Sequence, residues 1–506
     1  MSSGIVFPSR RPSRTKIVAT VGPASESEEM LGRLLDAGVD VFRINMAHGK
    51  TDRAQQLLDR IRKVSGEQGV PVAVLVDLAG PKIRLGEIPG GAYPCQTGTL
   101  IRFLRGEKTS EPNTFTSTYA SLADDLKLGN RVMLADGTVI LKVVQKETDS
   151  VTCEVVQGGV VRSRQGINLP GVNLSVKTIQ PADIENAKWA VKAGVDFLGM
   201  SFVRSASDIH ELRKILVETH DGKPEEVPHI IAKIEKPEAL IQLEEIVHAA
   251  DGIMVARGDL GVEVDIAQVA VTQKRILETC SRHCKPVIVA TQMLESMHHQ
   301  TVPTRAEATD VANAILDGTD ACMLSGETAV GEYPLEAVNM MHRIAMETEQ
   351  LLKVGNLRTE FGRLLKIFSG EFEKQHGTAV SRIPHHIDGV TEAVCEHAVR
   401  LADQIEASLL LVTSISGKTA LGLSKKRSFT LSIGTSTSET ALRRMCLYWG
   451  IIPLRDIPER PKEKLTALVE AGKAAGYLLR GNRVVLISGL RSTDTTRNVI
   501  YVHVVD

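Results

Sequence analysis

The chain has 506 residues, a length that predicts three or four domains of about 150 residues each and excludes a single small module. Hydrophobic residues make up 43% and charged residues 24%, which is typical of a globular protein that folds in water and too apolar for a disordered chain. Because 60 basic side chains nearly balance 61 acidic ones, the net charge is −1, and no overall charge attracts nucleic acid or an anionic membrane.

A short apolar run rich in Val and Ile recurs eight times along the first two thirds of the chain, each time followed by a helix-like stretch. Apolar strands buried on both faces and separated by amphipathic helices are what a parallel sheet requires. Eight such units predict a closed α/β barrel, the (β/α)8 or TIM barrel. The runs are residues 16–22, 39–45, 71–80, 195–202, 229–235, 252–261, 286–293 and 321–327.

The ends of several helices can also be read from the sequence. A similar turn with a helix-ending glycine precedes the strands in DAGVD (36–40), KAGVD (192–196) and DGTDA (317–321). Thr304 and Glu307 form a capping-box pattern that predicts the start of a helix.

An interruption of about ninety residues separates the third and fourth runs. Its alternating pattern and the turn signal Asp136-Gly137 predict β-hairpins, and therefore an inserted small β-barrel domain. Beyond residue 350 the barrel pattern ends, and strands expected at 407–413, 429–435 and 483–489 alternate with helices. The expected domains are 1–82 with 174–350 (the barrel), 83–173 (the insert, acting as a lid), 351–390 (a linker and connecting helix) and 391–506 (an α/β domain).

Catalytic groups of a β/α barrel lie at the carboxyl ends of its strands, because these ends and their loops share one rim. Glu235 and Asp259, on neighbouring strands, could hold Mg²⁺ or Mn²⁺ with hard oxygen ligands. Lys233, Arg43 and Arg84 are expected beside them, where they would neutralise a phosphoryl group or an enolate. The expected rim residues are Arg43, Asn45, Asp77, Ser201, Phe202, Lys233, Glu235, Arg257, Asp259, Thr291, Gln292, Ser325 and Glu327.

Each of these patterns also has an ordinary structural interpretation. Lys233 and Glu235 could form a simple ion pair at a strand end, and Thr291 could be a β-branched strand residue. Gly258 could mark a plain turn, although successive backbone N–H groups after it could equally cradle a carboxylate. The two side chains of the Lys-x-Glu motif point the same way, with a further carboxylate on the next strand, and this combination favours a catalytic site.

Several strings resemble the pyruvate kinase family: RINMAHG (43–49), DLAGPKIRLG (77–86), INLPG (167–171), IAKIEKPE (231–238), GIMVARGDLGVE (252–263), ATQMLESM (290–297), PTRAEATDVANAILDG (303–318) and MLSGETAVGEYPLEAV (323–338). The resemblance extends from about Lys16 to Glu347 and is looser beyond residue 350. It implies a barrel with a β-domain inserted after the third strand and a C-terminal α/β domain.

The resemblance implies phosphoryl transfer from phosphoenolpyruvate to ADP, which gives pyruvate and ATP in the last step of glycolysis. It assigns Glu235 and Asp259 to Mg²⁺, and Lys233 and Arg43 to the phosphoryl group, with Arg84 supporting the phosphate side. The remaining matches are Gly258, Asp259 and Thr291 for the substrate carboxylate, Ser201 and Phe202 for the pyruvate cavity, and Asn45 and His48 for the nucleotide side.

The string that contains Lys82 departs from the K⁺-requiring members of the family. Those members bind K⁺ at positions that match Asn45, Ala47, Asp77 and Leu78, and they carry Glu where this chain has Lys82. Two oxygen ligands are therefore missing. An ammonium group from Lys82 is the expected replacement beside Asp77, and activity without K⁺ is the expected consequence.

In the C-terminal region, TSISGKTA (413–420) matches a loop that binds a sugar-phosphate effector in regulated members of the family. A helix N-terminus there is a plausible anion site, and an ordinary strand-to-helix turn with a Ser N-cap is an equal alternative. The candidate effector residues are Thr413, Ser414, Ser416, Gly417, Lys418 and Thr419.

Two other functions are compatible with such a barrel. A metal-dependent aldolase or lyase that forms a pyruvate enolate would use the same carboxylates, and a non-enzymatic descendant would retain only effector binding. The seven irregularly spaced cysteines favour reduced thiols and the cytoplasm, and no apolar run approaches the roughly 20 residues that span a bilayer. The resemblance further implies a homotetramer, which is commonly allosteric.

Overall fold

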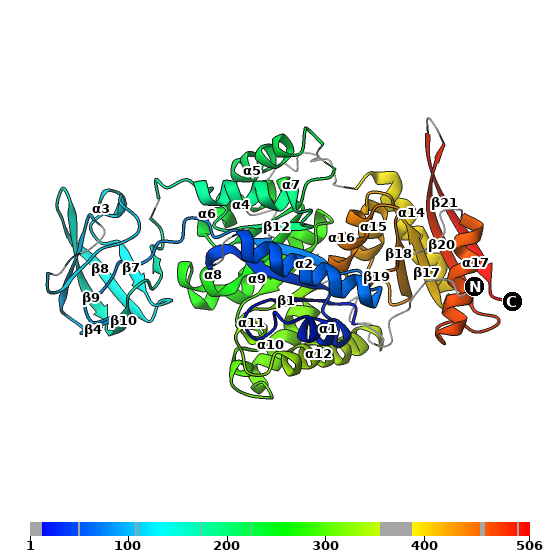
Figure 1. Cartoon of the computed structure of the whole chain (residues 1–506), viewed down its shortest axis with the longest axis horizontal. Coiled ribbons are helices and arrows are strands. Elements are labelled where there is room, and N and C mark those ends of the chain that lie inside the picture. The colour runs from blue at the N-terminus through cyan, green and yellow to red at the C-terminus, as the bar shows by residue number, and fades with distance from the viewer. Residues whose placement is uncertain are drawn as a thin grey trace, which may run out of the picture.

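The computed structural model describes residues 13–48, 51–106, 109, 111–172, 174–223, 225–354, 387–455, 461–492 and 495–506. Three parts follow one another along the long axis of the molecule, with the inserted β-domain at one end, the barrel in the middle and the C-terminal domain at the other end (Figure 1). Most of the linker expected at 351–390 lies outside the described residues.

The central part is a closed, all-parallel barrel with the strand order β1-β16-β15-β14-β13-β12-β3-β2. All eight predicted strands are confirmed, and nearly every strand residue is buried because helices cover the outer face and side chains fill the interior. The strands are β1 Lys16–Thr20, β2 Val41–Asn45, β3 Ala73–Asp77, β12 Phe197–Met200, β13 His229–Ile234, β14 Gly252–Ala256, β15 Val287–Ala290 and β16 Ala321–Leu324.

The predicted helix ends are also present. Gly38 ends α1 with a left-handed φ of 110°, and Thr304 and Glu307 form the expected capping box of α10. The helices around the barrel are α1 Glu28–Ala37, α2 Thr51–Gln68, α4 Pro181–Lys192, α5 Ala206–Thr219, α6 Pro237–Ile241, α7 Leu243–Ala249, α8 Arg257–Glu263, α9 Ile266–Arg282, α10 Arg305–Leu316, α11 Gly326–Ala329 and α12 Pro334–Val354, with short 3-10 turns η1 Met46–His48 and η2 Glu295–His298.

An aspartate stands immediately before every second strand of the barrel. Its carboxylate accepts a backbone N–H from the start of the preceding barrel strand, so each aspartate ties two neighbouring strands together at the base of the barrel. The contacts are Asp40 with Ile17 (2.9 Å), Asp196 with Val74 (2.8 Å), Asp251 with Ile230 (2.8 Å) and Asp320 with Val287 (2.8 Å). Three of these aspartates belong to the helix-to-strand repeats of the sequence.

The inserted part leaves the barrel after β3 and forms its own hydrophobic core. Its strands pair into a six-stranded sheet, β11-β7-β8-β9-β5-β6, and a two-stranded sheet, β10-β4, so the hydrogen bonding does not close one continuous barrel in the described residues. Asp136 and Gly137 have positive φ and form the expected turn between β7 and β8. The elements are β4 Ala92–Cys95, β5 Leu100–Leu104, β6 Thr114–Phe115, α3 Leu122–Asp125, β7 Arg131–Leu134, β8 Val139–Lys146, β9 Ser150–Gln157, β10 Gly159–Arg162 and β11 Ile167–Asn168.

The C-terminal part has a five-stranded sheet in the order β19-β18-β17-β20-β21, parallel except for the antiparallel pair β20 and β21. The three predicted strands are confirmed, whereas β19 and β21 were not predicted. The elements are α14 Gly389–Gln404, β17 Leu409–Thr413, α15 Lys418–Lys425, β18 Leu431–Thr435, α16 Glu439–Arg444, η3 Met445–Leu447, β19 Ile451–Pro453, α17 Pro461–Ala474, β20 Arg483–Ser492 and β21 Thr495–Val504.

The C-terminal domain covers the base of the barrel. Met445 and Tyr448 belong to the same buried cluster as the inward-facing barrel residues Val18, Leu75 and Met254. All seven cysteines are free and buried. In the part of the chain that the structure describes, no helix combines the length and the apolar character needed to cross a membrane.

Candidate active site

Lys233, near the end of β13, is the centre of a buried polar cluster at the carboxyl end of the barrel. Its Nζ lies 2.8 Å from Ser201 Oγ, 3.0 Å from Glu235 Oε1 and 3.2 Å from Asp77 Oδ2. Burial would lower the pKa of Lys233, but the negative charges of Asp77 and Glu235 outweigh it and raise the pKa above its ordinary value. Lys233 therefore carries its positive charge throughout the physiological pH range.

Asp77, the last residue of β3, binds a second cation. Arg43 on β2 places Nη2 2.5 Å and Nε 3.0 Å from Asp77 Oδ2, and its Nη1 donates to Thr20 Oγ1 at 3.1 Å. Burial would raise the pKa of Asp77, but Lys233 and Arg43 outweigh it and hold the pKa below its usual range. Two fixed cations thus share one carboxylate at the rim.

Glu235 and Asp259 provide two further carboxylates. Glu235 Oε2 accepts the backbone N–H of Phe202 at 2.7 Å, and Asp259, in the first turn of α8, faces solvent more openly. Burial raises the pKa of Glu235, Lys233 opposes this, and the nearby charge of Asp259 adds to the increase. Two hard oxygen donors with mutually repelling charges, one of them open to solvent, fit a small divalent cation.

Thr291 joins the ends of β15 and β14. Its Oγ1 accepts the backbone N–H of Gly258 at 2.7 Å and donates to Ala290 O at 2.6 Å. Arg257 donates to the carbonyls of Thr291 at 3.0 Å and Gln292 at 3.1 Å, and pairs with Asp310 at 2.6 Å. The geometry therefore brings Thr291, Gly258 and Asp259 to the same rim, as expected.

Three rim residues that are not glycine have left-handed backbone conformations. Phe202 has φ 56°, Thr291 has φ 68° and Gln292 has φ 53°. This conformation is unfavourable for residues with a Cβ atom, and such strain concentrates at functional sites. The signal was not visible in the sequence, because each strain depends on the surrounding contacts.

Arg84 does not join this cluster. Its Nη1 donates to Arg164 O at 3.2 Å and its backbone N–H donates to Thr118 Oγ1 at 2.9 Å, both within the inserted domain. Among the described residues, Arg84 makes no hydrogen bond or ion pair with a rim residue. The expectation that Arg84 converges on the rim is therefore wrong for this structure. Arg84 sits beyond the end of β3, where the packing of the insert, rather than the barrel, sets the direction of the side chain.

Lys82 also differs from its expected position. Its Nζ lies 3.6 Å from Asp259 Oδ1, whereas Arg43 and Lys233 neutralise Asp77. Asn45 ends β2 and its Oδ1 accepts the backbone N–H of Ala47 at 3.1 Å, while the side chain of His48 lies outside the described residues. Lys82 thus supplies its charge to the Glu235 and Asp259 side of the rim.

A cleft between the insert and the barrel was missed by the sequence interpretation. Lys236, Phe202 and Arg204 line it from the barrel, and Asn168 and Leu169 line it from the insert. Glu263 Oε1 accepts from Lys236 Nζ at 2.6 Å and from Asn168 Nδ2 at 3.3 Å, which links the two domains. The only sequence signal was the position of Lys236 directly after Glu235.

The predicted effector loop connects β17 to α15. Gly417 is the N-cap residue with φ 83°, and Ser414 Oγ accepts the backbone N–H of Thr419 at 3.2 Å, so the hydroxyl cap comes from Ser414 rather than from the exposed Ser416. Thr413 Oγ1 lies 3.3 Å from Thr435 Oγ1, and Lys418 begins the helix with an exposed side chain.

Comparisons with known proteins agree with this architecture. Residues 12–338 match the family described as "Pyruvate kinase, barrel domain", and residues 392–503 match "Pyruvate kinase, alpha/beta domain". The chain is 38% identical over 497 residues to a pyruvate kinase of Corynebacterium glutamicum, covering 97% of both proteins. It is 37% identical over 497 residues to one of Geobacillus stearothermophilus (97% of this chain, 80% of the relative) and 36% identical over 499 residues to one of Thermotoga maritima (97% and 99%). The chain therefore belongs to the pyruvate kinase family.

Proposed function

We propose that this protein transfers the phosphoryl group of phosphoenolpyruvate to ADP, giving ATP and pyruvate. The observation that carries the proposal is the buried Lys233 ammonium between Asp77, Glu235 and Ser201 at the carboxyl end of the barrel in a member of this family. Phosphoryl transfer depends chiefly on positioning and on neutralising negative charge, and these groups do both.

In this proposal, Lys233 and Arg43 stabilise negative charge on the transferring group. Thr291 and the backbone N–H groups of Gly258 and Asp259 bind the substrate carboxylate, and Ser201 and Phe202 shape the cavity of the pyruvate carbon skeleton. The inserted domain closes over the rim and limits the access of water. Its polar link to the barrel, Asn168 with Glu263, supports this role.

Glu235 and Asp259 would hold the divalent cation, Mg²⁺ or Mn²⁺. When bound, such an ion neutralises charge on phosphoryl oxygens as a Lewis acid. The two carboxylates differ in how firmly the protein holds them. Glu235 is fixed by the backbone N–H of Phe202 and by Lys233, whereas Asp259 remains accessible to solvent. Asn45 and His48 are assigned to the nucleotide side. Arg84 is assigned to the phosphate side in the closed state, in which the inserted domain has moved over the rim.

We further propose that the enzyme does not require K⁺. The ammonium group of Lys82, 3.6 Å from Asp259, supplies a fixed monovalent positive charge at the rim. Arg43 and Lys233 already neutralise Asp77, which matches a K⁺ ligand of the K⁺-requiring members, so this carboxylate needs no further cation.

A coupled assay tests both statements. Purified protein with phosphoenolpyruvate, ADP and Mg²⁺ is assayed for pyruvate and ATP in Tris buffer free of alkali metals, with and without added K⁺. We expect similar rates in both buffers. A rate without K⁺ below about a tenth of that with K⁺ contradicts K⁺ independence, whereas no ATP in either buffer contradicts the proposed reaction.

Four further assignments are proposals. The loop at 413–419 binds a phosphorylated effector, and unchanged activation of Ser416→Asp by every phosphosugar tested would contradict this. A homotetramer is expected by light scattering. The seven free, buried cysteines support a reducing compartment, and we propose the cytoplasm. We further propose that its partners are the substrates, the products and the effector, and that it binds neither nucleic acid nor a membrane.

A further inference from the structure

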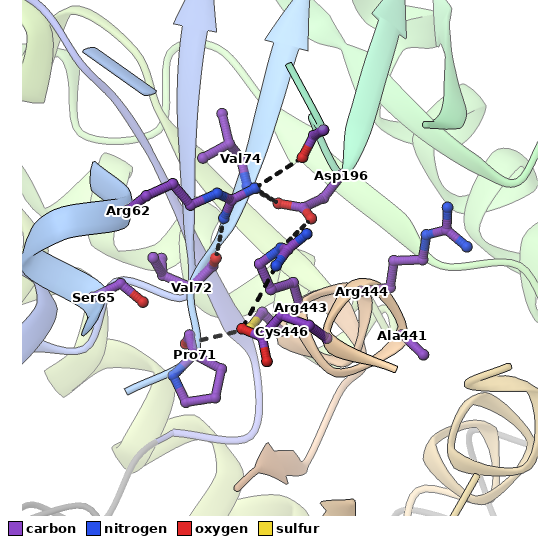
Figure 2. A network of polar contacts seen from close by, with 12 residues as sticks. Arg62, Ser65, Pro71, Val72, Val74, Asp196, Ala441, Arg443, Arg444 and Cys446 are labelled. Atoms are coloured by element: carbon purple, nitrogen blue, oxygen red, sulfur yellow. Dashed lines mark hydrogen bonds and ion pairs between the residues drawn. The ribbon is translucent and has the colours of Figure 1, made fainter. Parts of the chain in front are cut away.

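Asp196 joins the C-terminal domain to the base of the barrel (Figure 2). The residue is fully buried and directly precedes β12. Its Oδ2 lies 2.7 Å from Arg62 Nη2 and 2.8 Å from the backbone N of Val74, and its Oδ1 lies 2.6 Å from Arg443 Nε. Arg62 belongs to α2 of the barrel, whereas Arg443 belongs to α16 of the C-terminal domain, so one carboxylate holds cations from both domains.

The same carboxylate fixes two barrel strands to each other. Val74 is in β3, and Asp196 leads directly into β12, which pairs with β3 in the register Phe197 with Leu75 and Gly199 with Asp77. The Sγ of Cys446, just beyond α16, contacts Pro71 O at 3.4 Å, immediately before β3 (Figure 2). The base of the β3 and β12 pair is therefore held by two groups of the C-terminal domain.

The opposite ends of these two strands hold the site. Asp77 ends β3 and Ser201 follows β12, and together they provide two of the three polar contacts of Lys233. Ser201 Oγ also donates to Leu78 O at 2.8 Å, which ties the two strand ends together. A shift of β12 along β3 at the base is therefore transmitted to the groups that surround Lys233.

Packing between the strands leaves little room for such a shift. Gly199 lies so close to Asp77 that a Cβ atom at this position would be 2.6 Å from Asp77 Oδ1. Close-packed interiors transmit displacements rather than absorbing them. The position of Asp77 thus depends on the register that Asp196 fixes at the base.

We propose that Arg443 is a positioning residue for phosphoryl transfer, acting through Asp196 and the β3 and β12 pair on Lys233. The inference rests on the proposed function, since it concerns the efficiency of that reaction. Loss of Arg443 leaves Asp196 with Arg62 and the backbone N–H of Val74, and removal of one partner of a buried charge is destabilising. Misplacement of a catalytic group by about 1 Å, even through a change far from the reacting atoms, can lower the rate about 10²-fold.

The test compares Arg443→Met with Arg444→Met in the full-length protein. Arg444 is the neighbouring buried arginine, and it points away from Asp196 (Figure 2). Its Nη2 donates to Val227 O at 2.6 Å and its Nη1 to Glu225 O at 3.3 Å, in the loop that leads into β13. Both variants weaken the contact between the domains, but only Arg443→Met removes a partner of Asp196 at the base of the β3 and β12 pair.

We expect both variants to lower the Tm, and only Arg443→Met to lower kcat, by about tenfold, with the KM for ADP nearly unchanged. Arg443→Lys, which keeps a cation beside Asp196, is expected to recover most of kcat. If Arg443→Met does not fold, Arg443→Lys and Arg444→Lys are compared, and we expect a small loss of kcat in Arg443→Lys and none in Arg444→Lys.

Equal kcat values in the matched variants at positions 443 and 444 overturn the inference. It is also overturned if, across the variants at positions 443 and 444, the loss of kcat simply follows the loss of Tm. A third contrary result is an Arg443→Lys variant with a restored Tm and an unrestored kcat. These outcomes differ from failure of the proposed function, in which the wild-type protein itself forms no ATP from phosphoenolpyruvate and ADP.

Discussion

At the residue scale, the chemistry of the rim depends on how two cations and two carboxylates share a buried space. Lys233 contacts both Asp77 and Glu235, whereas Arg43 contacts Asp77 alone. Since Asp259 is more exposed and lies 3.6 Å from Lys82, the proposed divalent cation would approach from that side. In the proposed reaction, phosphate and metal would therefore meet opposite charges only a few side chains apart.

Replacing Lys233 by Met is expected to lower kcat by about 10³-fold, because the transferring phosphoryl group loses a preorganised positive charge. The KM for ADP should change little. The exposed Lys188, on α4, provides a matched control, and Lys188→Met should retain the wild-type kcat. Steady-state kinetics at saturating Mg²⁺ check this, and a loss of less than tenfold would exclude the role of Lys233.

Gly199→Ala is expected to lower kcat by about tenfold or more, because the added methyl group would lie 2.6 Å from Asp77 Oδ1 and displace that carboxylate. The Tm should fall as well. Gly66 in α2 has open space around it, so Gly66→Ala should leave kcat unchanged and raise the Tm slightly. Equal kcat values for the two variants would contradict the positioning of Asp77 by close packing.

The convergence of Arg43, Asp77, Lys233 and Glu235 could be predicted because strand ends of a parallel barrel share one rim. The directions of Lys82 and Arg84 could not be predicted in the same way. Both lie in the connection to the insert, where loop packing, rather than strand periodicity, determines the orientation of a side chain. The same limit explains why the link from Asn168 to Glu263 was missed.

At the scale of secondary structure elements, buried polar groups at the base align helices with strands. Lys285, just before β15, donates to the carbonyls of His248 at 3.2 Å and Ala250 at 2.5 Å, at the end of α7. Burial lowers the pKa of Lys285 to about 8, although Asp251 opposes the shift. The contact thus holds α7 to β15 while keeping a titratable group in the interior.

This shift predicts a dependence of stability on pH. Between about pH 8 and its unfolded pKa of 10.5, Lys285 is protonated in the unfolded chain and largely neutral in the folded one, so stability from this group rises with pH. Below pH 8 both states carry the proton, and the desolvation cost is present in full. The Tm of the wild type minus that of Lys285→Met should therefore increase from pH 7.5 to 10, as measured by thermal unfolding.

A constant difference in Tm across this range would show that Lys285 keeps its ordinary pKa. A decreasing difference would show that its pKa is raised by Asp251 instead. Since both proteins share every other titrating group, their difference isolates this one.

The eight barrel strands were predictable because each is a continuous apolar run, and three of them follow a recurring glycine turn. Two C-terminal strands were not. β19 has only three residues, Ile451–Pro453, and β21 pairs along the edge of the sheet, so neither shows the strong burial pattern of a central parallel strand. The insert was predictable as a β-structure, but its division into two sheets depends on long-range pairing.

At the scale of the whole molecule, the barrel and the C-terminal domain share a hydrophobic core. Barrel residues such as Leu75 and Met254 are in one buried cluster with Met445 and Tyr448. The base of the barrel is therefore covered by Met445 and Tyr448. In the chain, these residues come more than 200 positions after most of the barrel strands.

A fragment that ends at residue 354 is expected to lose cooperative unfolding and to aggregate, because the apolar base of the barrel is uncovered and the buried Asp196 and Asp320 lose their cationic partners in the C-terminal domain. Size-exclusion chromatography and near-ultraviolet circular dichroism check this against the full-length protein. A monomeric fragment with a sharp thermal transition would contradict the shared core.

The interruption of the barrel between β3 and β12 also bears on how the chain folds. These two strands pair although they lie about 120 residues apart in the chain, further than any other two consecutive strands of the barrel. Loop-closure entropy makes distant pairings slow to form, and the separate core of the insert shortens the effective loop once the insert has folded. We therefore expect the seam between β3 and β12 to close later than the pairings of the other consecutive barrel strands, and the surroundings of Lys233 to be completed when it closes.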